Sequence, residues 1–305
     1  MGKGEESIYH LPVLLDETIE LLAIKPDGIY VDCTFGGGGH SKAILEKLTG
    51  AARLVVFDQD EAARQNLLND KRLLFIPHNF RHIKRFLQLH GIKEVDGILA
   101  DLGASSHQLN ERDRGFSTRF DAKLDMRMDR RQSQTAMTVL NNYSENQLHK
   151  LFEKYGQVTN SKTLARIIVE VRKTASLQTT NGFKDIVSSI VKGNPNKYFA
   201  QVFQALRIEV NDEFGALKEM LEQAPQLLKK GGRVAVITFH SLEDRIVKVF
   251  FREGTFKINE ENPFLMEKIS KPLKAINKKP IEATEEEIRR NPRSRSAKLR
   301  VAEKV

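Results

Sequence analysis

Short apolar runs rich in β-branched residues alternate along the chain with segments in which apolar residues recur every three or four positions. Runs of the first kind predict buried strands, and segments of the second kind predict helices. The predicted strands cover residues 28–33, 53–58, 73–77, 95–101 and 232–239. The first four begin 20 to 25 residues apart, which is the spacing of βα units. The pattern therefore predicts an α/β fold with a parallel sheet and crossover helices.

A long helical insertion is predicted between the fourth and fifth strands, which are separated by about 130 residues. One crossover helix needs far fewer. Ser144 and Gln147 form a capping-box pattern at the start of one predicted helix, and Gly156 stands where its C-cap belongs. The apolar stripes of this region lie at residues 148–155, 164–171 and 183–190.

The sheet domain is therefore predicted to be discontinuous, at residues 1–109 and 206–305. The inserted helical subdomain is predicted at residues 110–205, where it is placed to recognise a substrate. Residues 210–230 predict a long helix and turn that lead back into the fifth strand.

The charge balance points to a polyanionic partner, because 49 lysines and arginines exceed 40 acidic residues and give a net charge of +9. The last 35 residues carry 11 of these cations and 5 of the acids, a net charge of +6. We therefore predict that Arg293, Arg295, Lys298 and Arg300 contact phosphate groups. A solubilising tail is the alternative interpretation.

The numbers and positions of cysteine and histidine residues narrow the possible classes of protein further. The only cysteine, Cys33, excludes an internal disulfide and a cysteine-based zinc site, and we expect its side chain to pack as a small apolar group. His78 and His82 stand four residues apart without an evident third ligand, so no metal site is predicted. No apolar run approaches the roughly 20 residues that span a bilayer, and no signal peptide is evident, so a cytoplasmic location is expected.

A glycine-rich loop follows the first predicted strand, at Asp32-Cys33-Thr34-Phe35-Gly36-Gly37-Gly38-Gly39-His40-Ser41. The third glycine of a dinucleotide fingerprint is replaced by Ser41. The pattern instead resembles the D-x-x-x-G-x-G loop of class I methyltransferases that bind S-adenosylmethionine. Asp58, which ends the next strand, stands where a carboxylate accepts hydrogen bonds from ribose hydroxyls. A tight turn without a ligand is the alternative.

Two further residues are candidates at the carboxyl edge of the sheet. Phe80 follows the third strand and is predicted to cover the adenine ring, with an ordinary core aromatic as the alternative. Asp101 ends the fourth strand, where the methyl acceptor should arrive, although an acid at this position can also cap a helix.

The chemistry is narrowed by the single cysteine. Methylation of a pyrimidine at C5 needs a cysteine nucleophile, and Cys33 lies in the cofactor loop, which excludes that route. An exocyclic amine needs no covalent catalysis, because its nitrogen can attack the sulfonium methyl directly. Whether Asp101, another group or water takes the amine proton stays open.

Two polar segments are candidates for RNA contact. Residues 112–131 interleave acidic and basic side chains, and from them we predict RNA contacts by Arg114 and Arg127 and a stacking platform at Phe116. The alternative is a solvated loop whose charges pair with one another. The segment 240–245 follows the fifth strand at the same edge as Asp101, or simply begins a capped helix.

These motifs, taken in order, resemble the bacterial small-subunit (16S) ribosomal RNA cytosine-N4 methyltransferase family (RsmH/MraW) from about His10 to the C-terminus. The matching stretches are residues 10–15, 32–41, 101–103 with 105–106 and 108–109, 114–117, 124–129, 203–211, 239–245 and 291–300. The departures are His107, Asn110, Lys123 and the segment 195–200, and they affect loop geometry and RNA contacts.

The resemblance implies a class I, Rossmann-like S-adenosylmethionine-dependent methyltransferase sheet with an inserted helical subdomain. It implies transfer of methyl to N4 of a cytidine in the decoding region of 16S ribosomal RNA, with the RNA or the small ribosomal subunit as partner. The cofactor contacts that carry over are Gly38, Gly39, His40, Asp58, Phe80, Asp101 and Gln108. Ribose 2′-O methylation, or RNA binding without catalysis in ribosome assembly, are the alternatives.

Overall fold

The computed structural model describes residues 11–256 and 271–305, so His10, the first residue of the matching stretches, lies outside the described residues. The chain divides into two compact units. The sheet unit comprises Met1–Gly103 and Gly215–Val305, and the helical unit comprises Ala104–Phe214. The helical unit begins before and ends after the predicted range of 110–205.

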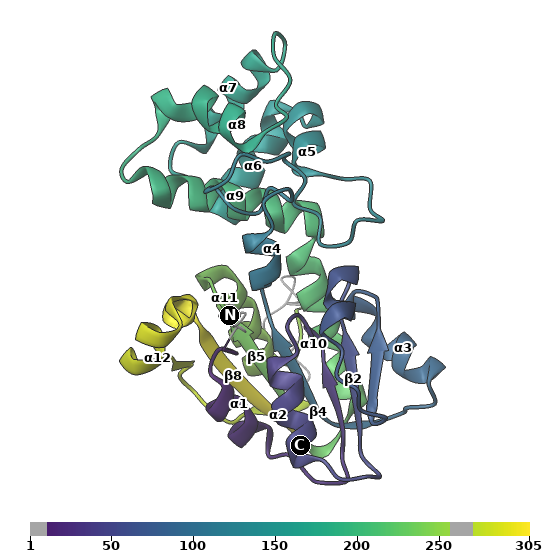
Figure 1. The fold of residues 1–305 in the computed structure, drawn as a ribbon. Helices are drawn as coiled ribbons and strands as arrows, with labels where there is room; N and C mark the ends of the chain where they lie inside the picture. The colour runs from purple at the N-terminus through teal and green to yellow at the C-terminus, as the bar shows by residue number, and fades with distance from the viewer. Residues whose placement is uncertain (1–10, 257–270) are drawn as a thin grey trace. The chain divides into compact units, whose positions relative to one another are not determined.

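The sheet unit is built on one eight-stranded sheet in the order β3-β2-β1-β4-β5-β8-β6, with β7 paired to β8 (Figure 1). The strands are β1 Ile29–Asp32, β2 Arg53–Phe57, β3 Leu73–Ile76, β4 Val95–Asp101, β5 Leu228–Thr238, β6 Leu273–Ala275, β7 Ile281–Glu282 and β8 Lys298–Lys304. Strands β1 to β5 are parallel, as the βα spacing predicted. The strand order reverses between β1 and β4, which makes their carboxyl ends the switch point where ligands bind in such sheets.

The fifth strand starts earlier than predicted, at Leu228 rather than Gly232. Leu228 pairs with Val95, and the register then shifts so that Arg233 pairs with Gly97. The residues between form an irregularity in which Gly231 has a φ of +74°. The predicted turn is therefore contained within the strand.

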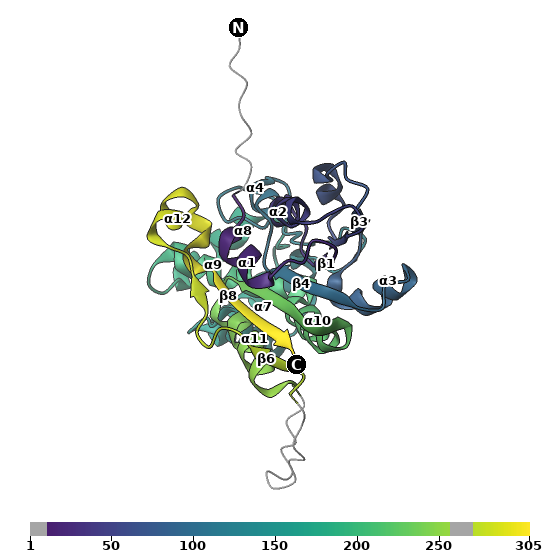
Figure 2. The ribbon, with the colours of Figure 1, turned by 90° about the horizontal axis from the view of Figure 1, so that it is seen from below.

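The C-terminal strands were not predicted from the sequence. Strand β8 pairs antiparallel with β5 along its length and also pairs with β6 and β7. Figure 2 shows β8 beside β6. Leu299 and Val301 point to one face and Ala302 to the other, and all three are buried. Lysines and an arginine interrupt this alternating pattern, and their charge hid the strand from the sequence analysis.

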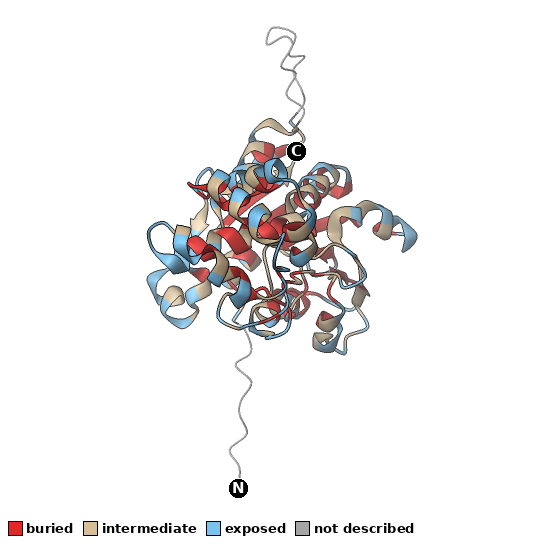
Figure 3. Ribbon diagram, turned by 90° about the horizontal axis from the view of Figure 1, so that it is seen from above, coloured by how far each residue is buried: buried red, intermediate tan, exposed pale blue. Residues whose placement is uncertain are grey.

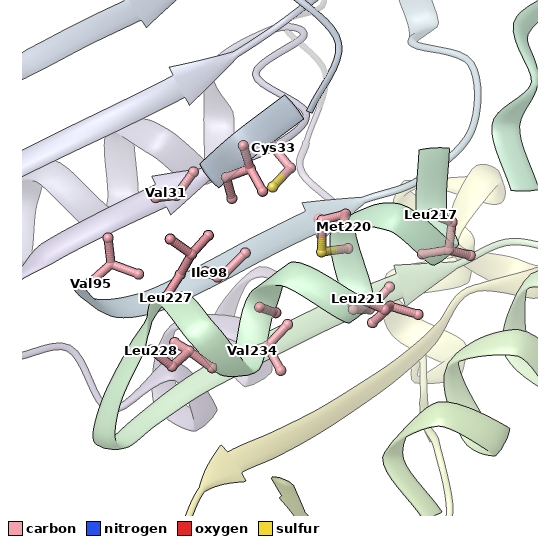
Figure 4. Packing of buried hydrophobic residues seen from close by; sticks show 14 of the residues in the cluster. Val31, Cys33, Val95, Ile98, Leu217, Met220, Leu221, Leu227, Leu228 and Val234 are labelled. Atoms are coloured by element: carbon pink, nitrogen blue, oxygen red, sulfur yellow. The ribbon is translucent and has the colours of Figure 1, made fainter. Parts of the chain in front are cut away.

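Helices cover both faces of the sheet, which explains the near-continuous apolar character of its central strands. On one face lie α1 Leu15–Leu22 and α2 Gly39–Lys47, and on the other lie α3 Ile83–Leu89, α10 Glu213–Leu227 and α11 Ser241–Glu253. In Figure 4, Leu217, Met220 and Leu221 of α10 pack over the sheet. Cys33 belongs to this cluster with 1% of its surface exposed, which confirms its predicted apolar role. The remaining short elements of the sheet unit are η1 Glu61–Asn66, η2 Phe80–His82, α12 Glu285–Arg290 and η5 Pro292–Ser296.

The helical unit has its own apolar core. Its elements are α4 Ser106–Asn110, α5 Ala136–Asn142, α6 Glu145–Gly156, α7 Ser161–Val171, α8 Thr180–Val187, η3 Ser188–Ile190 and α9 Pro195–Asn211. Buried and exposed positions alternate along these helices as the stripes predicted (Figure 3). Both hydrogen bonds of the predicted box between Ser144 and Gln147 are present.

Two helix ends differ from prediction. Gln157, with a φ of 52°, caps α6, while Gly156 is its last residue and lies against α9, where an added Cβ would be 2.8 Å from the carbonyl oxygen of Gln201. The helix predicted to start at Val210 is broken at Asp212, whose φ of 46° ends α9 before α10 begins. No helix of the described ranges is long and apolar enough to cross a membrane.

Candidate functional site

The glycine loop connects β1 to α2. Gly36 and Gly38 have φ values of 50° and 76°, and Gly38 is the N-cap of α2. An added Cβ would lie 3.1 Å from the Phe35 ring at Gly38 and 3.0 Å from the Pro12 ring at Gly39. Both glycines are thus closely packed on their own side, and at these two positions the loop presents backbone at a helix N-terminus.

Asp32 fixes this loop from within. Its side chain is 1% exposed and accepts hydrogen bonds from the Thr34 backbone N–H at 3.0 Å and the Ser41 hydroxyl at 2.6 Å. Burial raises the pKa of Asp32, and these hydrogen bonds only partly oppose it. Asp32, the acid of the motif, therefore stabilises the fold by linking the loop to α2 through these hydrogen bonds.

Asp58 supports the loop from the neighbouring strand. Its Oδ2 accepts the Gly36 N–H and its Oδ1 accepts the Asp60 N–H, both at 2.8 Å. Burial raises the pKa of Asp58 to about 7 despite these two donors, and the charges of Asp60 and Asp32 add to the effect. Each carboxylate oxygen keeps a further lone pair that can accept a hydroxyl hydrogen bond.

Phe80 begins the short helix η2 at the end of β3 and is partly buried. Asn79, which caps η2, donates from its amide to the Gln59 side chain at 2.9 Å. This bond ties the segment after β3 to the segment after β2. Phe80 and Asp58 therefore lie on adjoining loops at the carboxyl edge of the sheet.

Asp101 ends β4 beside the glycine loop. Its backbone N–H donates to the Thr34 hydroxyl at 2.6 Å, and Thr34 in turn lies within 3.4 Å of Asp32 Oδ1. Oδ1 of Asp101 is buried and has no hydrogen-bond partner among the described residues, and Oδ2 lies 3.8 Å from Nδ1 of His40. Burial, with the charges of Asp32 and Glu243, raises the pKa of Asp101 well above its usual range.

His40 faces this carboxylate as a neutral ring. Its side chain is 7% exposed, and burial lowers its pKa more than Asp32 raises it. Its Nε2 lies 3.0 Å from the Val13 carbonyl oxygen, which can only accept, so Nε2 carries the proton. Nδ1, which faces Asp101, is consequently an unprotonated acceptor.

The carboxyl edge of the sheet is thus lined with carboxyl groups. We call Asp32, Asp58, Asp101 and Glu243 the acidic edge, because each raises the pKa of another or has its own pKa raised there. An edge of this kind favours a ligand that brings positive charge. Within the described residues, no group of three or more side chains is arranged to hold a metal ion.

Comparison with known proteins places the chain in a family. The model of the MraW methylase family matches residues 7–305. The chain belongs to the MraW methylase family. Proteins named ribosomal RNA small subunit methyltransferase H are similar to it throughout. The one from Azobacteroides pseudotrichonymphae is 52% identical over 301 residues, 98% of this chain and 99% of that protein. The one from Flavobacterium johnsoniae is 53% identical over 298 residues, 97% of this chain and 98% of that protein.

Similarity to solved structures is weaker. A putative rRNA methylase from Clostridium thermocellum aligns with a TM-score of 0.45 and 11% identity, covering 97% of this chain and 100% of that chain.

Membership of the MraW family makes the sheet a class I, Rossmann-like methyltransferase sheet, and it makes the cofactor S-adenosylmethionine, as predicted. The residues fit this cofactor, because its sulfonium is cationic and suits an acidic edge that holds a buried carboxylate oxygen without a partner.

The predicted residues of the helical unit have structural partners. Gln108 is 4% exposed and completes the capping box of α4, its Oε1 accepting the Ser105 N–H at 3.0 Å. Arg114 is 3% exposed and donates to the carbonyl oxygens of Arg127 and Met128. Arg127 pairs through two nitrogens with Asp125 at 2.7 and 2.8 Å.

Phe116 needs a correction as the predicted stacking platform. It is 7% exposed and belongs to the apolar core of the helical unit, with the Arg114 guanidinium 5.4 Å from its ring centroid. A ring buried in this way has no free face for a base. The charges of the segment pair with one another, but they do so around buried apolar residues such as Leu124 and Met126, so the segment is not the solvated loop of the alternative interpretation.

The C-terminal cations differ in their exposure and in whether they pair with an acidic side chain. Arg300 is 7% exposed and donates to both oxygens of Asp244 at 2.6 and 3.1 Å, so its prediction as a phosphate contact is wrong in this structure. Lys298 lies 3.6 Å from a Glu282 oxygen. Arg293 is partly exposed and Arg295 is exposed, and both belong to η5.

Sequence reasoning missed Thr34 and Glu243. Thr34 stands two residues after the strand acid, where a hydroxyl can accept a backbone N–H of the adjacent strand end. Glu243 is 2% exposed and accepts the Phe239 N–H at 2.9 Å. The signal for Glu243 was an acid three residues into a helix after a strand, but its burial depends on tertiary packing.

Proposed function

We propose that this protein transfers a methyl group from S-adenosylmethionine to N4 of a cytidine in 16S ribosomal RNA. The observation that carries the proposal is the Asp101 carboxyl group, which ends β4 beside the glycine loop with one buried oxygen left without a partner among the described residues. The supporting comparison is about 50% identity over nearly the whole chain to proteins named ribosomal RNA small subunit methyltransferase H.

The cofactor is held by the glycine loop and by the two strand-end loops beside it. Gly38 and Gly39 would let it approach the backbone, the Asp58 carboxylate would accept hydrogen bonds from its ribose hydroxyls, and Phe80 would cover its adenine ring. When bound, S-adenosylmethionine supplies an electrophilic methyl group on a cationic sulfur. The acidic edge would favour this positive charge and would therefore hold the cofactor more strongly than its neutral product.

Asp101 orients the amine. Its free oxygen accepts one N4–H and aims the nitrogen lone pair at the methyl group. Thr34 holds the Asp101 backbone by accepting its N–H at 2.6 Å, which fixes the position of the carboxylate. Orientation of this kind can supply roughly 7 to 11 kcal/mol of barrier lowering, so no covalent intermediate is required.

Asp101 and His40 can together accept the proton that the amine loses. The raised pKa of Asp101 makes its carboxylate a better base than an exposed aspartate. The unprotonated Nδ1 of His40 lies 3.8 Å from Asp101 Oδ2 and is placed to share that proton after transfer. The proposed acceptor is therefore Asp101, with His40 behind it.

The helical unit is proposed to recognise the RNA. It is inserted in the sequence between β4 and β5 and begins at Ala104, shortly after Asp101. Gln108 stands only seven residues beyond Asp101 and stays a proposed cofactor contact. The protein is proposed to act in the cytoplasm, where its substrate is made.

The test is incubation of the protein with labelled S-adenosylmethionine and unmodified small ribosomal subunits, followed by nucleoside analysis. Label in N4-methylcytidine is expected. Label in a 2′-O-methylated nucleoside would instead identify a ribose methyltransferase. Cofactor binding without transfer, to subunits or to naked 16S RNA, would indicate a noncatalytic assembly protein.

A further inference from the structure

A cytosine that presents N4 to the cofactor must have its ring plane held. Enzymes that act on an extruded base hold it by stacking it on aromatic or apolar side chains. Phe116, predicted for this role, is enclosed in the core of the helical unit. An aromatic ring next to Asp101 is needed instead, and the sheet unit supplies one.

Phe239 directly follows β5 at the carboxyl edge. Strands β4 and β5 are parallel there, with Asp101 in register with Ile237, and the Leu102 N–H donates to the Ile237 carbonyl oxygen at 3.0 Å. Phe239 stands two residues beyond Ile237, and both pack against the cluster beneath α1 and α2. Asp101 and Phe239 therefore lie on the same face of adjacent strand ends.

The Phe239 ring lies beside the segment that follows Asp101. Its Cδ2 would be 3.6 Å from a Cβ added to Gly103, which is van der Waals contact with the chain two residues beyond the carboxylate. Gly103 has a φ of 96°, a conformation that favours glycine. The ring is only partly buried, although it packs against an apolar cluster.

The backbone of Phe239 is held firmly. Its N–H donates to Oε2 of Glu243 at 2.9 Å, and Glu243 is 2% exposed. The Glu243 N–H in turn donates to Nδ1 of His240, the N-cap of α11, at 3.4 Å. A buried carboxylate and a helix start thus fix the backbone from which the Phe239 ring projects, which contributes to the preorganisation that a positioning surface requires.

We propose that Phe239 is the surface on which the target cytosine ring stacks, with the Asp101 carboxylate at the edge of that ring to receive the N4 amine. The inference rests on the proposed function and extends it to the residue that positions the base. Phe239 acts on binding and orientation of the base and takes no part in proton transfer.

The test compares Phe239→Leu, which keeps an apolar side chain, with Phe239→Tyr and Phe239→Trp, which keep an aromatic face. Phe256→Leu is the matched control, because Phe256 is another partly buried aromatic of the sheet unit that packs on Phe250, beyond the far end of α11. For each variant, S-adenosylmethionine Kd is measured by calorimetry, and kcat and KM are measured on unmodified small subunits.

Phe239→Leu is expected to lower kcat/KM for the subunits on the order of 10- to 100-fold, with cofactor Kd within about twofold of the parent. The tyrosine and tryptophan variants are expected to recover most of the loss, and Phe256→Leu to match the parent. An active parent with an equally active Phe239→Leu would overturn the inference, as would a loss that neither aromatic variant recovers. Failure of the parent to form N4-methylcytidine would instead refute the proposed function.

Discussion

The acidic edge of the sheet unit and the charged segment 112–131 of the helical unit both bring carboxyl groups into partly or fully buried positions, but they treat the charge in opposite ways. In the charged segment, burial alone would raise the pKa of Asp125, yet hydrogen bonds from Arg127 outweigh it and lower the pKa. In the acidic edge, burial raises the pKa of Asp32, Asp58 and Asp101. Among the described residues, no lysine or arginine pairs with these three.

This contrast distinguishes carboxylates that stabilise the fold from carboxylates that are available to bind a ligand or to react. A paired carboxylate stabilises the fold and has little left to offer a ligand. An unpaired buried carboxylate costs stability unless a ligand compensates it, so its persistence points to a binding or reacting group. The sequence marks residues 112–131 and 240–245 as polar segments, and it does not distinguish a paired carboxylate from an unpaired one.

The largest expected effect comes from replacing one aspartate by asparagine in each region, Asp101 in the acidic edge and Asp125 in the charged segment. Asp101→Asn should lower the single-turnover methylation rate by roughly 10²- to 10⁴-fold, because the amide can still accept a hydrogen bond from the amine but cannot take its proton. The melting temperature should not fall, since the variant replaces a buried carboxyl group whose Oδ1 has no hydrogen-bond partner among the described residues. Rapid-quench assays and thermal melts measure the two quantities.

Asp125→Asn is the matched control for that exchange. It should lower stability by roughly 1 to 3 kcal/mol, because Arg127 loses its charged partner, and leave cofactor affinity within about twofold. A near-normal single-turnover rate for Asp101→Asn would remove Asp101 from the reaction centre and erase the distinction between the two regions.

A second prediction concerns the hydrogen bonds that shape the charged segment. Asn211 is 3% exposed, donates to the Met126 and Arg207 carbonyl oxygens, and accepts the Met128 N–H at 2.7 Å. Asn211→Ala leaves these groups unsatisfied and should lower the free energy of unfolding by about 2 to 4 kcal/mol in urea titrations. Calorimetry should find S-adenosylmethionine affinity unchanged. A large loss of cofactor affinity would show that the segment contributes directly to the cofactor site.

A third prediction follows from the pKa of Asp58, which is about 7 in the fold. The native state holds this proton more tightly than the unfolded chain, so the group favours folding below about pH 4 and loses that contribution as pH rises to 7. Ribose hydroxyls donate to the ionised form. S-adenosylmethionine Kd should therefore rise on the order of tenfold from pH 8 to pH 6, with proton release at pH 6.

Calorimetry in two buffers of different ionisation enthalpy measures that proton release. Asp58→Asn should bind the cofactor more weakly and with a flatter pH dependence between pH 6 and 8. An unchanged affinity for the variant would refute the assigned role of Asp58.

The smallest expected effect concerns Arg295, which is exposed in η5. Arg295→Ala should reduce the slope of log affinity for 16S RNA against log salt by about 0.7 to 0.9, the effect of one phosphate contact. Arg252→Ala is the control, because Arg252 is exposed at the end of α11 and pairs with Glu253. Equal slopes for the parent and Arg295→Ala in filter-binding assays would remove η5 from the RNA-binding surface.

The parallel strands and the loop chemistry could be predicted because their signals are local. Strands β1 to β4 are short apolar runs with regular spacing, and the glycines after β1 encode the backbone conformations that a close approach needs. The family motifs are local as well. Sequence therefore determined the fold class, the cofactor loop and the identity of Asp101 and Asp58 as candidates.

Tertiary structure decided which charges are available. Arg300 and Arg295 stand five residues apart in one basic stretch, yet one is buried against Asp244 in a sheet strand and the other is exposed. Phe116 lies in a core, while Phe239 lies at the strand end beside Asp101. Burial and pairing depend on residues distant in the chain, and the free energy of a charge or a ring depends on those surroundings, so no local pattern could distinguish these cases.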